Sequence, residues 1–278
     1  MASAEEITRQ AKSNLAFTFV GVSPDRRGDL NIFYAFCRVI DDLADDTSLD
    51  TTEQRRTLDR WQHIVSGKVE PEDELEKEVV AVIQRRKIDP SLVEEIVTGC
   101  QSDLSRQRFG TWKDLQEYTF QVASAVGLAC LPILGASPAA KEYATTLGHA
   151  LQLTNILRDV GEDIRNEARI YLPLADLHRF QYTERDLVGQ VHDGRFLALM
   201  NFEADRAEEL FAKAVELLPP QDRDALFSAE LMRIIYHSLL QRMRKDQFRV
   251  FDRRYRLSKP HKLALLTREV IRKKWGNS

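Results

Sequence analysis

The sequence predicts a single all-α domain, and two observations lead to that fold class. Apolar residues recur at spacings of three and four through most of the 278 residues, which is the pattern of helices that bury one face. No stretch sustains the alternation of apolar and polar residues that a half-buried strand would show. Hydrophobic residues make up 43% of the chain, enough for a sizeable core. We expect one domain over residues 1–278, because no repeat or low-complexity linker divides the chain.

Prolines and short turn clusters separate the segments that we expect to form helices. Each of these segments has apolar residues recurring along one face. The stretch 167–194 lacks such a pattern, so we expect loop and short turns there. The helices are expected at 3–20, 27–46, 51–66, 73–87, 91–106, 111–131, 138–166, 195–218, 221–247 and 260–274.

The net charge of −3 gives the whole molecule no nucleic-acid signature. The charge is uneven, however. Thirteen Lys and Arg against three Asp and Glu lie between Arg242 and Ser278, a net of +10 that leaves −13 for the rest of the chain. A basic segment of this kind suits substrate phosphates or an anionic bilayer, and it is equally consistent with a solvated helix face. Peripheral association with the inner face of a membrane is therefore one of two interpretations.

The cysteines and the N-terminus suggest a cytoplasmic protein. Cys37, Cys100 and Cys130 are widely spaced and odd in number, which gives neither a disulfide framework nor a zinc site. The first residues have no basic n-region and no apolar h-region, so we expect no signal peptide. The longest near-apolar stretch, 122–136, is interrupted by Ser, Gly and Pro, and we expect no membrane span. The oligomeric state is not indicated.

The first chemically informative segment, 34–46, is rich in aspartate. At about 100° per residue, four of its side chains fall within about 60° of arc on one helix face. They are Tyr34, Arg38, Asp41 and Asp45, with Asp42 and Asp46 towards the edge of this stripe. Aspartates are poor helix formers, and like charges four residues apart repel. A bound cation would explain the pattern better than local stability does.

The second segment, 148–163, carries a polar stripe along an otherwise apolar helix. Five of its positions fall within about 80° of arc. They are Gly148, Gln152, Asn155, Asp159 and Asp163. The other faces hold Ala, Leu, Ile and Val, and a solvated surface helix is not normally so apolar. We therefore expect the stripe to face a cavity.

Either stripe alone is as well explained by a solvated helix face. Together they offer only oxygen ligands, with neither His nor Cys, and this suits Mg²⁺. Mg²⁺ typically takes one or two carboxylates, several waters and substrate phosphate oxygens. Two opposed faces of this kind predict a site that clamps a diphosphate through several ions. Arg38 and Arg158 would neutralise the remaining charge through forked hydrogen bonds.

Three longer motifs contain or accompany these stripes. They are Tyr34-Ala-Phe-Cys-Arg38-x-x-Asp41-Asp42-x-x-Asp45, then Tyr118-x-x-x-Val122-Ala-x-x-Val126-Gly127, and then Gly148-x-x-x-Gln152-x-x-Asn155-Ile-x-Arg158-Asp159-x-x-Glu162-Asp163, which continues as Arg169-Ile-Tyr171-Leu-Pro173. In this combination the chain, from about Ser13 to about Leu266, resembles the squalene/phytoene synthase family. The resemblance implies a class I isoprenoid synthase fold, with helices around a central apolar cavity.

The resemblance also implies roles for individual residues. Five match Mg²⁺ ligands, direct or through water: Asp41, Asp45, Asn155, Asp159 and Asp163. The diphosphate-contacting set is matched by Tyr34, Arg38, Gln152 and Arg158. The four aspartates would act in catalysis with Tyr118 and Tyr171, which match tyrosines that border the reacting allylic carbons. Tyr236 and Arg254 match a substrate-contacting pair, and Ser13 matches a further diphosphate contact, although Asn14 and Leu15 depart from the serine and phenylalanine usual there.

Outside these motifs the same residue types have ordinary structural interpretations. Tyr118 and Tyr171 alone would be core tyrosines with satisfied hydroxyls. We assign His149 and His237 to structural or surface positions, because neither has an evident partner in the sequence. No Ser/His/Asp or Cys/His arrangement is evident, so we expect the barrier to be lowered electrostatically.

The implied activity is the head-to-head condensation of two allylic prenyl diphosphates with release of diphosphate. Within the family, two farnesyl diphosphates give thirty-carbon products such as presqualene diphosphate, squalene or dehydrosqualene. Two geranylgeranyl diphosphates give phytoene. The segments 232–240 and 254–263 favour a thirty-carbon product, and phytoene is the alternative. Use of NADPH is left open, because related reductive enzymes bind it without a GxGxxG fingerprint.

Two other functions deserve comparison with this one. A different class I enzyme would ionise one substrate and cyclise it, but the continuation from Arg169 to Pro173 argues against that. A non-catalytic helical relative, serving as an assembly factor or a lipid-binding scaffold, would be expected to lose aspartates from the paired motifs. Both motifs are complete in this sequence.

Overall fold

The computed structural model describes residues 22–46, 48–105, 108–167 and 169–275. Its elements are α2 (Pro24–Asp45), α3 (Thr51–Val65), α4 (Glu74–Arg86), α5 (Pro90–Ser102), α6 (Trp112–Thr119), η2 (Phe120–Ser124), α7 (Ala125–Leu134), η3 (Pro138–Ala140), α8 (Lys141–Glu167), α9 (Leu174–Arg179), α10 (Glu184–Val188), α11 (Gly194–Leu217), η4 (Pro220–Asp222), α12 (Phe227–Lys245) and α13 (Lys259–Trp275). Here η2 is a π-helix, and η3 and η4 are 3-10 helices. The described part of the chain contains helices and no strand, which confirms the predicted all-α class.

The local sequence explains where many of these helices begin and end. Pro24 and Pro90 stand in the first turns of α2 and α5, where a missing N–H costs nothing. Asp73 caps α4 and forms a reciprocal capping box with Glu76. After α7, Gly135 has a φ of 80°, a left-handed conformation that favours glycine and ends the helix.

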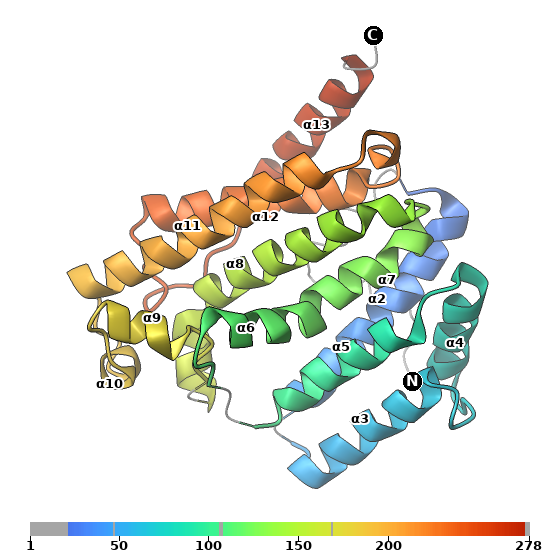
Figure 1. The fold of residues 1–278 in the computed structure, drawn as a ribbon, viewed down its shortest axis with the longest axis horizontal. Coiled ribbons are helices and arrows are strands. Elements are labelled where there is room, and N and C mark those ends of the chain that lie inside the picture. The colour runs from blue at the N-terminus through green and yellow to red at the C-terminus, as the bar shows by residue number, and fades with distance from the viewer. Residues whose placement is uncertain (1–21, 47, 106–107, 168, 276–278) are drawn as a thin grey trace.

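Helix α8 lies in the middle of the molecule (Figure 1). It packs against α11 and α12 on one side and against η2 and α7 on the other. Helices α5 and α2 pack against α7. Helix α3 packs against α5 and α2, and α4 packs against α2. The buried apolar side chains form two clusters. The larger one surrounds α8 and α11, and the smaller one is formed by the four helices from α2 through α5 together with α7. The two aspartate stripes therefore lie on helices that belong to different clusters.

The helix expected at 111–131 is interrupted by the π-helix η2. Two glycines from neighbouring helices explain the interruption. A Cβ on Gly148 of α8 would lie 2.5 Å from the Cα of Ser124, and a Cβ on Gly99 of α5 would lie 2.7 Å from a side chain of η2. The segment is thus held closely between two helices. Its wider turn depends on tertiary packing, which spacing within one segment does not reveal.

Two short helices, α9 and α10, occupy the stretch 167–194, where we expected only loop and short turns. Helix α10 begins with a capping box in which the Asp186 N–H donates to the Thr183 hydroxyl and the Thr183 N–H donates to the Asp186 carboxylate. Helices of six and five residues are too short to show a period. The helix expected at 91–106 ends at Ser102, and α12 begins only after η4.

One helical stretch of the described chain, Trp112–Leu134, has the length and apolar composition of a membrane span. Of its most apolar window, 44% is buried inside the protein, and the stretch packs against α5 and α8. A core helix meets the same criteria, so this stretch is no argument for a membrane span. The helix expected at 3–20 lies outside the described residues.

Candidate active site

The first acidic stripe occupies the last turns of α2. The side chains of Asp41 and Asp45 are 56% and 58% exposed. Arg38 lies one turn earlier, and its Nη1 donates to Asp41 Oδ2 at 3.0 Å. The Nε of the same guanidinium donates to Asp42 at 2.9 Å. This end of the helix therefore carries one arginine beside a row of accessible carboxylates.

The second acidic stripe lies in the C-terminal half of α8 and is less exposed. The side chain of Asp159 is 16% exposed, and Arg158 donates to both of its oxygens. One turn further along, Asp163 is half-buried. One turn earlier, Asn155 Nδ2 donates to Gln152 Oε1 at 3.2 Å, while the buried Oδ1 of Asn155 has no hydrogen-bond partner among the described residues. A buried acceptor of this kind is costly unless a ligand satisfies it.

Arg169, in the segment after α8, connects the two stripes. Its Nη1 lies 3.0 Å from Asp45 Oδ1 on α2. Its guanidinium also interacts electrostatically with Asp41 on α2 and with Asp163 on α8. The carboxylates of the two helices therefore face a common region around this arginine. The sequence motif contained Arg169, but its bridging role depends on the tertiary fold.

Arg254 reaches the second stripe from the segment between α12 and α13. Its Nε lies 3.0 Å from Asp159 Oδ1 and 3.1 Å from Glu162 Oε2. Gly161 makes this approach possible, because a Cβ there would lie only 2.2 Å from the main-chain oxygen of Val250. The segment thus crosses directly over α8. Arg254, which we expected to contact the substrate, therefore lies next to Asp159, an expected metal ligand.

One carboxylate of each stripe, Asp41 and Asp163, lies in surroundings that disfavour its charge. Burial and the charge of Asp45 raise the pKa of Asp41 to about 6, even though 56% of that side chain is accessible to solvent. Burial and the charge of Asp159 raise the pKa of Asp163 to about 8. Desolvation and like charges both shift acids in this direction, and a bound cation opposes both effects.

The donor set fits a hard divalent cation. Among the described residues, no three His, Cys, Asp or Glu side chains converge on one ion position. Mg²⁺ does not require such a group, because it commonly takes one or two carboxylates and completes its shell with water and phosphate oxygens. The oxygen-only stripes, the raised pKa values and the unpartnered oxygen of Asn155 all suit that ion.

Tyr118 on α6 and Tyr171 after α8 lie side by side, with ring centroids 5.3 Å apart. Phe109 packs against both rings, at 5.2 and 6.0 Å. The two hydroxyls donate to one carboxylate, Tyr118 to Asp103 Oδ2 at 2.9 Å and Tyr171 to Asp103 Oδ1 at 3.0 Å. Asp103 belongs to none of the three sequence motifs. It lies in the turn after α5, where no helical spacing relates it to either tyrosine.

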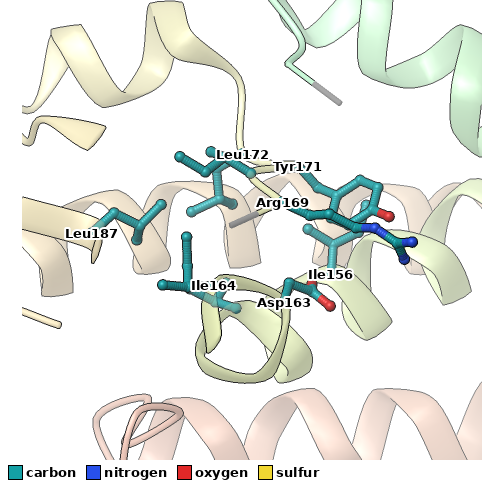
Figure 2. A pocket seen from close by; sticks show the side chains of 9 residues that line it. Ile156, Asp163, Ile164, Arg169, Tyr171, Leu172 and Leu187 are labelled. Atoms are coloured by element: carbon teal, nitrogen blue, oxygen red, sulfur yellow. The ribbon is translucent and has the colours of Figure 1, made fainter. Parts of the chain in front are cut away.

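A pocket adjoins these groups between α8 and the segment that carries Tyr171 (Figure 2). Asp163, Arg169 and Tyr171 contribute its polar groups. Apolar side chains form the rest of its lining: Ile156, Val160, Ile164, Ile170, Leu172 and Leu187. Asp163 of the second stripe and Arg169 thus border an apolar wall.

The other predicted substrate contacts differ in how far the structure describes them. Tyr34 is partly buried and packs against the smaller apolar cluster. The Tyr236 side chain on α12 interacts with the Arg158 guanidinium, which brings a further helix to the second stripe. Burial would lower the pKa of Arg158, but its bond to Asp159 raises it overall, so the guanidinium stays charged. Ser13 lies outside the described residues.

Three other positions have structural roles. His149 Nδ1 lies 2.8 Å from the Thr119 hydroxyl, and His237 Nε2 lies 2.6 Å from Glu208, so both histidines have partners that the sequence did not reveal. Gly148, which we expected to share the cavity-facing stripe, instead packs against η2. Its small size serves the helix crossing and not the site.

Known proteins resemble this chain along most of its length. The squalene/phytoene synthase family matches residues 8–261. The 15-cis-phytoene synthase of Synechocystis sp. is 36% identical, over 95% of this chain and 83% of that protein. The phytoene synthase of Mycobacterium tuberculosis is 33% identical, over 91% of this chain and 85% of that protein.

Solved structures agree with the sequence relatives. A dehydrosqualene synthase crystallised with a ligand has a TM-score of 0.84 and 29% identity, covering 98% of this chain and 95% of its own. The squalene synthase HpnC from Alicyclobacillus acidocaldarius has a TM-score of 0.77, covering 88% of this chain and 93% of its own, and at 24% identity it supports the fold alone. The chain therefore belongs to the squalene/phytoene synthase family of prenyltransferases, in which two prenyl diphosphates are condensed head to head.

Proposed function

We propose that this protein condenses two allylic prenyl diphosphates head to head in a reaction that depends on Mg²⁺. The observation that carries the proposal concerns Asn155, one turn before Asp159: its buried Oδ1 has no hydrogen-bond partner in the part of the chain that the structure describes. A purely structural helix would not be expected to keep such an acceptor. A site for a cation and a diphosphate accounts for it, and for carboxylates whose charge the protein leaves poorly compensated.

The two stripes would hold the ions from opposite sides. When bound, Mg²⁺ supplies positive charge that stabilises the departing diphosphate. The residues that would hold it are Asp41 and Asp45 on α2 and Asn155, Asp159 and Asp163 on α8. Of these, Asp163 has the most strongly raised pKa, so its ionised form gains most from a nearby cation.

Four arginines surround the same region and would bind the diphosphate. They are Arg38, Arg158, Arg169 and Arg254, and each has an acidic partner within the site. Guanidinium forks match the geometry of phosphate oxygens. They would orient the donor and stabilise the charge that develops on the leaving group as its C–O bond breaks.

The aromatic stack of Phe109, Tyr118 and Tyr171 would border the allylic cation. Aromatic faces attract cations, and an apolar wall excludes water that would capture one. The double bond of the acceptor attacks the cation, and loss of a proton gives a cyclopropylcarbinyl diphosphate. A second ionisation releases the remaining diphosphate, and the rearranged cation either loses a second proton, which gives phytoene or dehydrosqualene, or accepts a hydride from NADPH, which gives squalene.

For the chain length, the sequence relatives favour geranylgeranyl diphosphate and a forty-carbon product. Both relatives compared above are named phytoene synthases. The thirty-carbon product that we favoured from segments 232–240 and 254–263 is the second candidate. It is supported by the structural similarity to a dehydrosqualene synthase.

Product analysis tests both the reaction and the chain length. The enzyme would be incubated with each prenyl diphosphate, with and without NADPH, and with Mg²⁺ or excess chelator. We expect a forty-carbon hydrocarbon from geranylgeranyl diphosphate and no coupled product in chelator. A preference for farnesyl diphosphate would replace the substrate but keep the reaction. No coupled product from either substrate would refute the proposed function.

We also propose that α13 attaches the protein to the cytoplasmic face of an anionic membrane. Leu265 packs against the larger apolar cluster. Leu263 and Ile271 lie elsewhere on the helix and are 54% and 51% exposed, with exposed Arg268 and Arg272 beside them. The C-terminal end of α13 projects from the other helices (Figure 1). Exposed apolar residues flanked by cations suit a helix that lies in a lipid interface.

Liposome flotation tests this attachment. We expect enrichment on anionic over neutral liposomes, weakening at high salt because exposed charges are screened. The double variant Leu263→Asp/Ile271→Asp should lose it, whereas Val215→Asp, an exposed apolar position on α11, should not. Equal recovery on both liposome types would mean that the basic segment is an ordinary solvated helix face.

A further inference from the structure

Asp103 is the shared acceptor of the tyrosine pair. Its two carboxylate oxygens each take one hydroxyl hydrogen bond, from Tyr118 and from Tyr171. Burial raises the pKa of both tyrosines, and the charge of Asp103 raises it further. Both hydroxyls therefore stay protonated, and their protons point at Asp103.

Three separate segments must meet to form this group. Asp103 directly follows α5, Tyr118 lies on α6, and Tyr171 lies beyond α8. A parallel bridge joins Arg108 to Ile170, and the Leu174 N–H donates to the Phe109 carbonyl at 2.8 Å. These contacts hold the segment of Tyr171 beside the segment that leads from Asp103 to α6.

The same turn is connected to the first acidic stripe. Arg169 donates through Nη2 to the main-chain carbonyl of Asp103 at 3.2 Å and through Nη1 to Asp45 at 3.0 Å. Asp103 thus contacts the tyrosine pair through its side chain and Arg169 through its main chain. This bond to the main chain places the turn of Asp103 beside the first acidic stripe.

We propose that Asp103 is a positioning residue for the condensation, acting through Tyr118 and Tyr171. This inference rests on the proposed function. Because the carboxylate accepts a hydrogen bond from each hydroxyl, the lone pairs of the two tyrosine oxygens are directed away from it. A hydrogen bond to a carboxylate polarises the donor O–H, so it also makes each phenol oxygen more electron-rich. The two oxygens are then held as neutral, oriented acceptors beside the developing allylic cation.

The substitution Asp103→Asn separates orientation from bulk. An amide of the same shape can accept from one hydroxyl through its oxygen, but its NH₂ group must donate to the other. One tyrosine is then turned round while the packing is kept. Asp222→Asn is the matched control, since Asp222 is buried and accepts two hydrogen bonds from Ser137 outside the site.

The experiment measures kcat, KM, the folded fraction and the ratio of coupled product to free prenyl alcohol. For Asp103→Asn we expect kcat to fall by about 10²-fold, as when one preorganised polar contact is lost. We expect KM to stay unchanged and prenyl alcohol to increase, since a poorly held cation is captured by water. Asp222→Asn should lower stability and leave kcat and product ratio unchanged.

A variant in which Tyr118 and Tyr171 are both replaced by Phe provides a second measurement. It should shift the product ratio in the same direction, and adding Asp103→Asn to it should cause little further loss, because the three residues act as one unit. Normal kcat and product ratio in Asp103→Asn would overturn the inference. So would a loss explained wholly by a smaller folded fraction, or full additivity with the tyrosine variant. If the wild type couples neither prenyl diphosphate, the proposed function fails first and this inference fails with it.

Discussion

The two ends of helix α2 carry aspartates in opposite surroundings. Near its start, Asp29 is 3% exposed and accepts hydrogen bonds from Arg85 and Arg86 at the end of α4. Burial alone would raise the pKa of Asp29, but these two arginines lower it below its ordinary value. Near the end of α2, burial and the charge of Asp45 raise the pKa of Asp41 to about 6.

The partners available at the two ends explain this difference. Asp29 is paired with two arginines of α4, whereas the last turn of α2 contains no basic residue. At one end an aspartate joins α2 to α4 and has its charge fully satisfied. At the other end the protein keeps carboxylates whose charge it compensates poorly. The same side chain serves stability in the first case and, as we propose, ligand binding in the second.

The largest expected effect comes from removing a carboxylate at the C-terminal end. We expect Asp41→Ala, and likewise Asp159→Ala on α8, to lower kcat by about 10²–10³-fold, because each removes a ligand for the ions that stabilise the leaving diphosphate. Circular dichroism should show an unchanged helical fold, since neither side chain contributes much packing. Turnover would be measured at saturating Mg²⁺ and substrate.

Chelation is the companion measurement. Excess chelator should abolish turnover of the wild type, and added Mg²⁺ should restore it. Full activity in chelator, or full activity of Asp41→Ala, would mean that the stripes are solvated helix faces and that the contrast between the two ends of α2 has no functional meaning.

The next effect concerns the opposite end of the helix. We expect Asp29→Asn to destabilise the protein by about 2–3 kcal/mol, because it leaves two arginines without their buried partner. The value is kept below that for a fully buried pair because Arg85 is 48% exposed. Urea unfolding measures it. The kcat of the folded fraction should not change, and wild-type stability would mean that water replaces Asp29 at no cost.

The spacing rules found the acidic stripes because each stripe lies within one helix. Asp41 and Asp45, or Asp159 and Asp163, are one turn apart in the sequence and therefore also in space. On α8 the same rules distinguished a polar stripe from apolar faces, but the pocket is lined by Asp163 of the stripe together with Ile156, Val160 and Ile164 of the apolar faces. They assigned Gly148 incorrectly, because a glycine that allows a helix crossing has the same spacing as a residue that faces a ligand.

The tyrosine site could not be found by such rules. Asp103, Tyr118 and Tyr171 come from three segments that meet only through the Arg108–Ile170 bridge and the packing of α6. The π-helix beside Tyr118 likewise depends on close contacts with α5 and α8. The resemblance to a family pointed to both tyrosines, but the residue that orients them has no local signal in the sequence.

The two ends of α2 should also respond to pH with opposite sign. The folded-state pKa of Asp29 lies below its ordinary 3.8, so it contributes stability that is present above that pH and is lost as the pH falls through the folded pKa. The pKa of Asp41 is raised to about 6. The folded state then holds a proton that the unfolded chain has released, and stability falls as pH rises from about 4 to about 6.

Unfolding in chelator between about pH 3 and pH 7 tests this contrast. In Asp29→Asn, the free energy of unfolding should fall less as the pH drops below about 4. In Asp41→Asn, it should fall less as the pH rises from about 4 to about 6. If both variants flattened the same pH range, the opposite environments inferred for the two carboxylates would be wrong.

The smallest effect is expected for Asp46, which follows Asp45 in the sequence but lies outside the stripe. Its Oδ1 accepts hydrogen bonds from the main-chain N–H and the hydroxyl of Ser48, at 2.8 and 2.6 Å. These bonds lower its pKa, so its charge, like that of Asp29, is satisfied within the protein. We expect Asp46→Ala to leave kcat within about twofold of the wild type. The assay should run beside Asp41→Ala at the same Mg²⁺ concentrations. A loss as large as that of Asp41→Ala would mean that helical spacing misidentified which aspartates face the diphosphate, and that the end of α2 acts as one undivided acidic cluster.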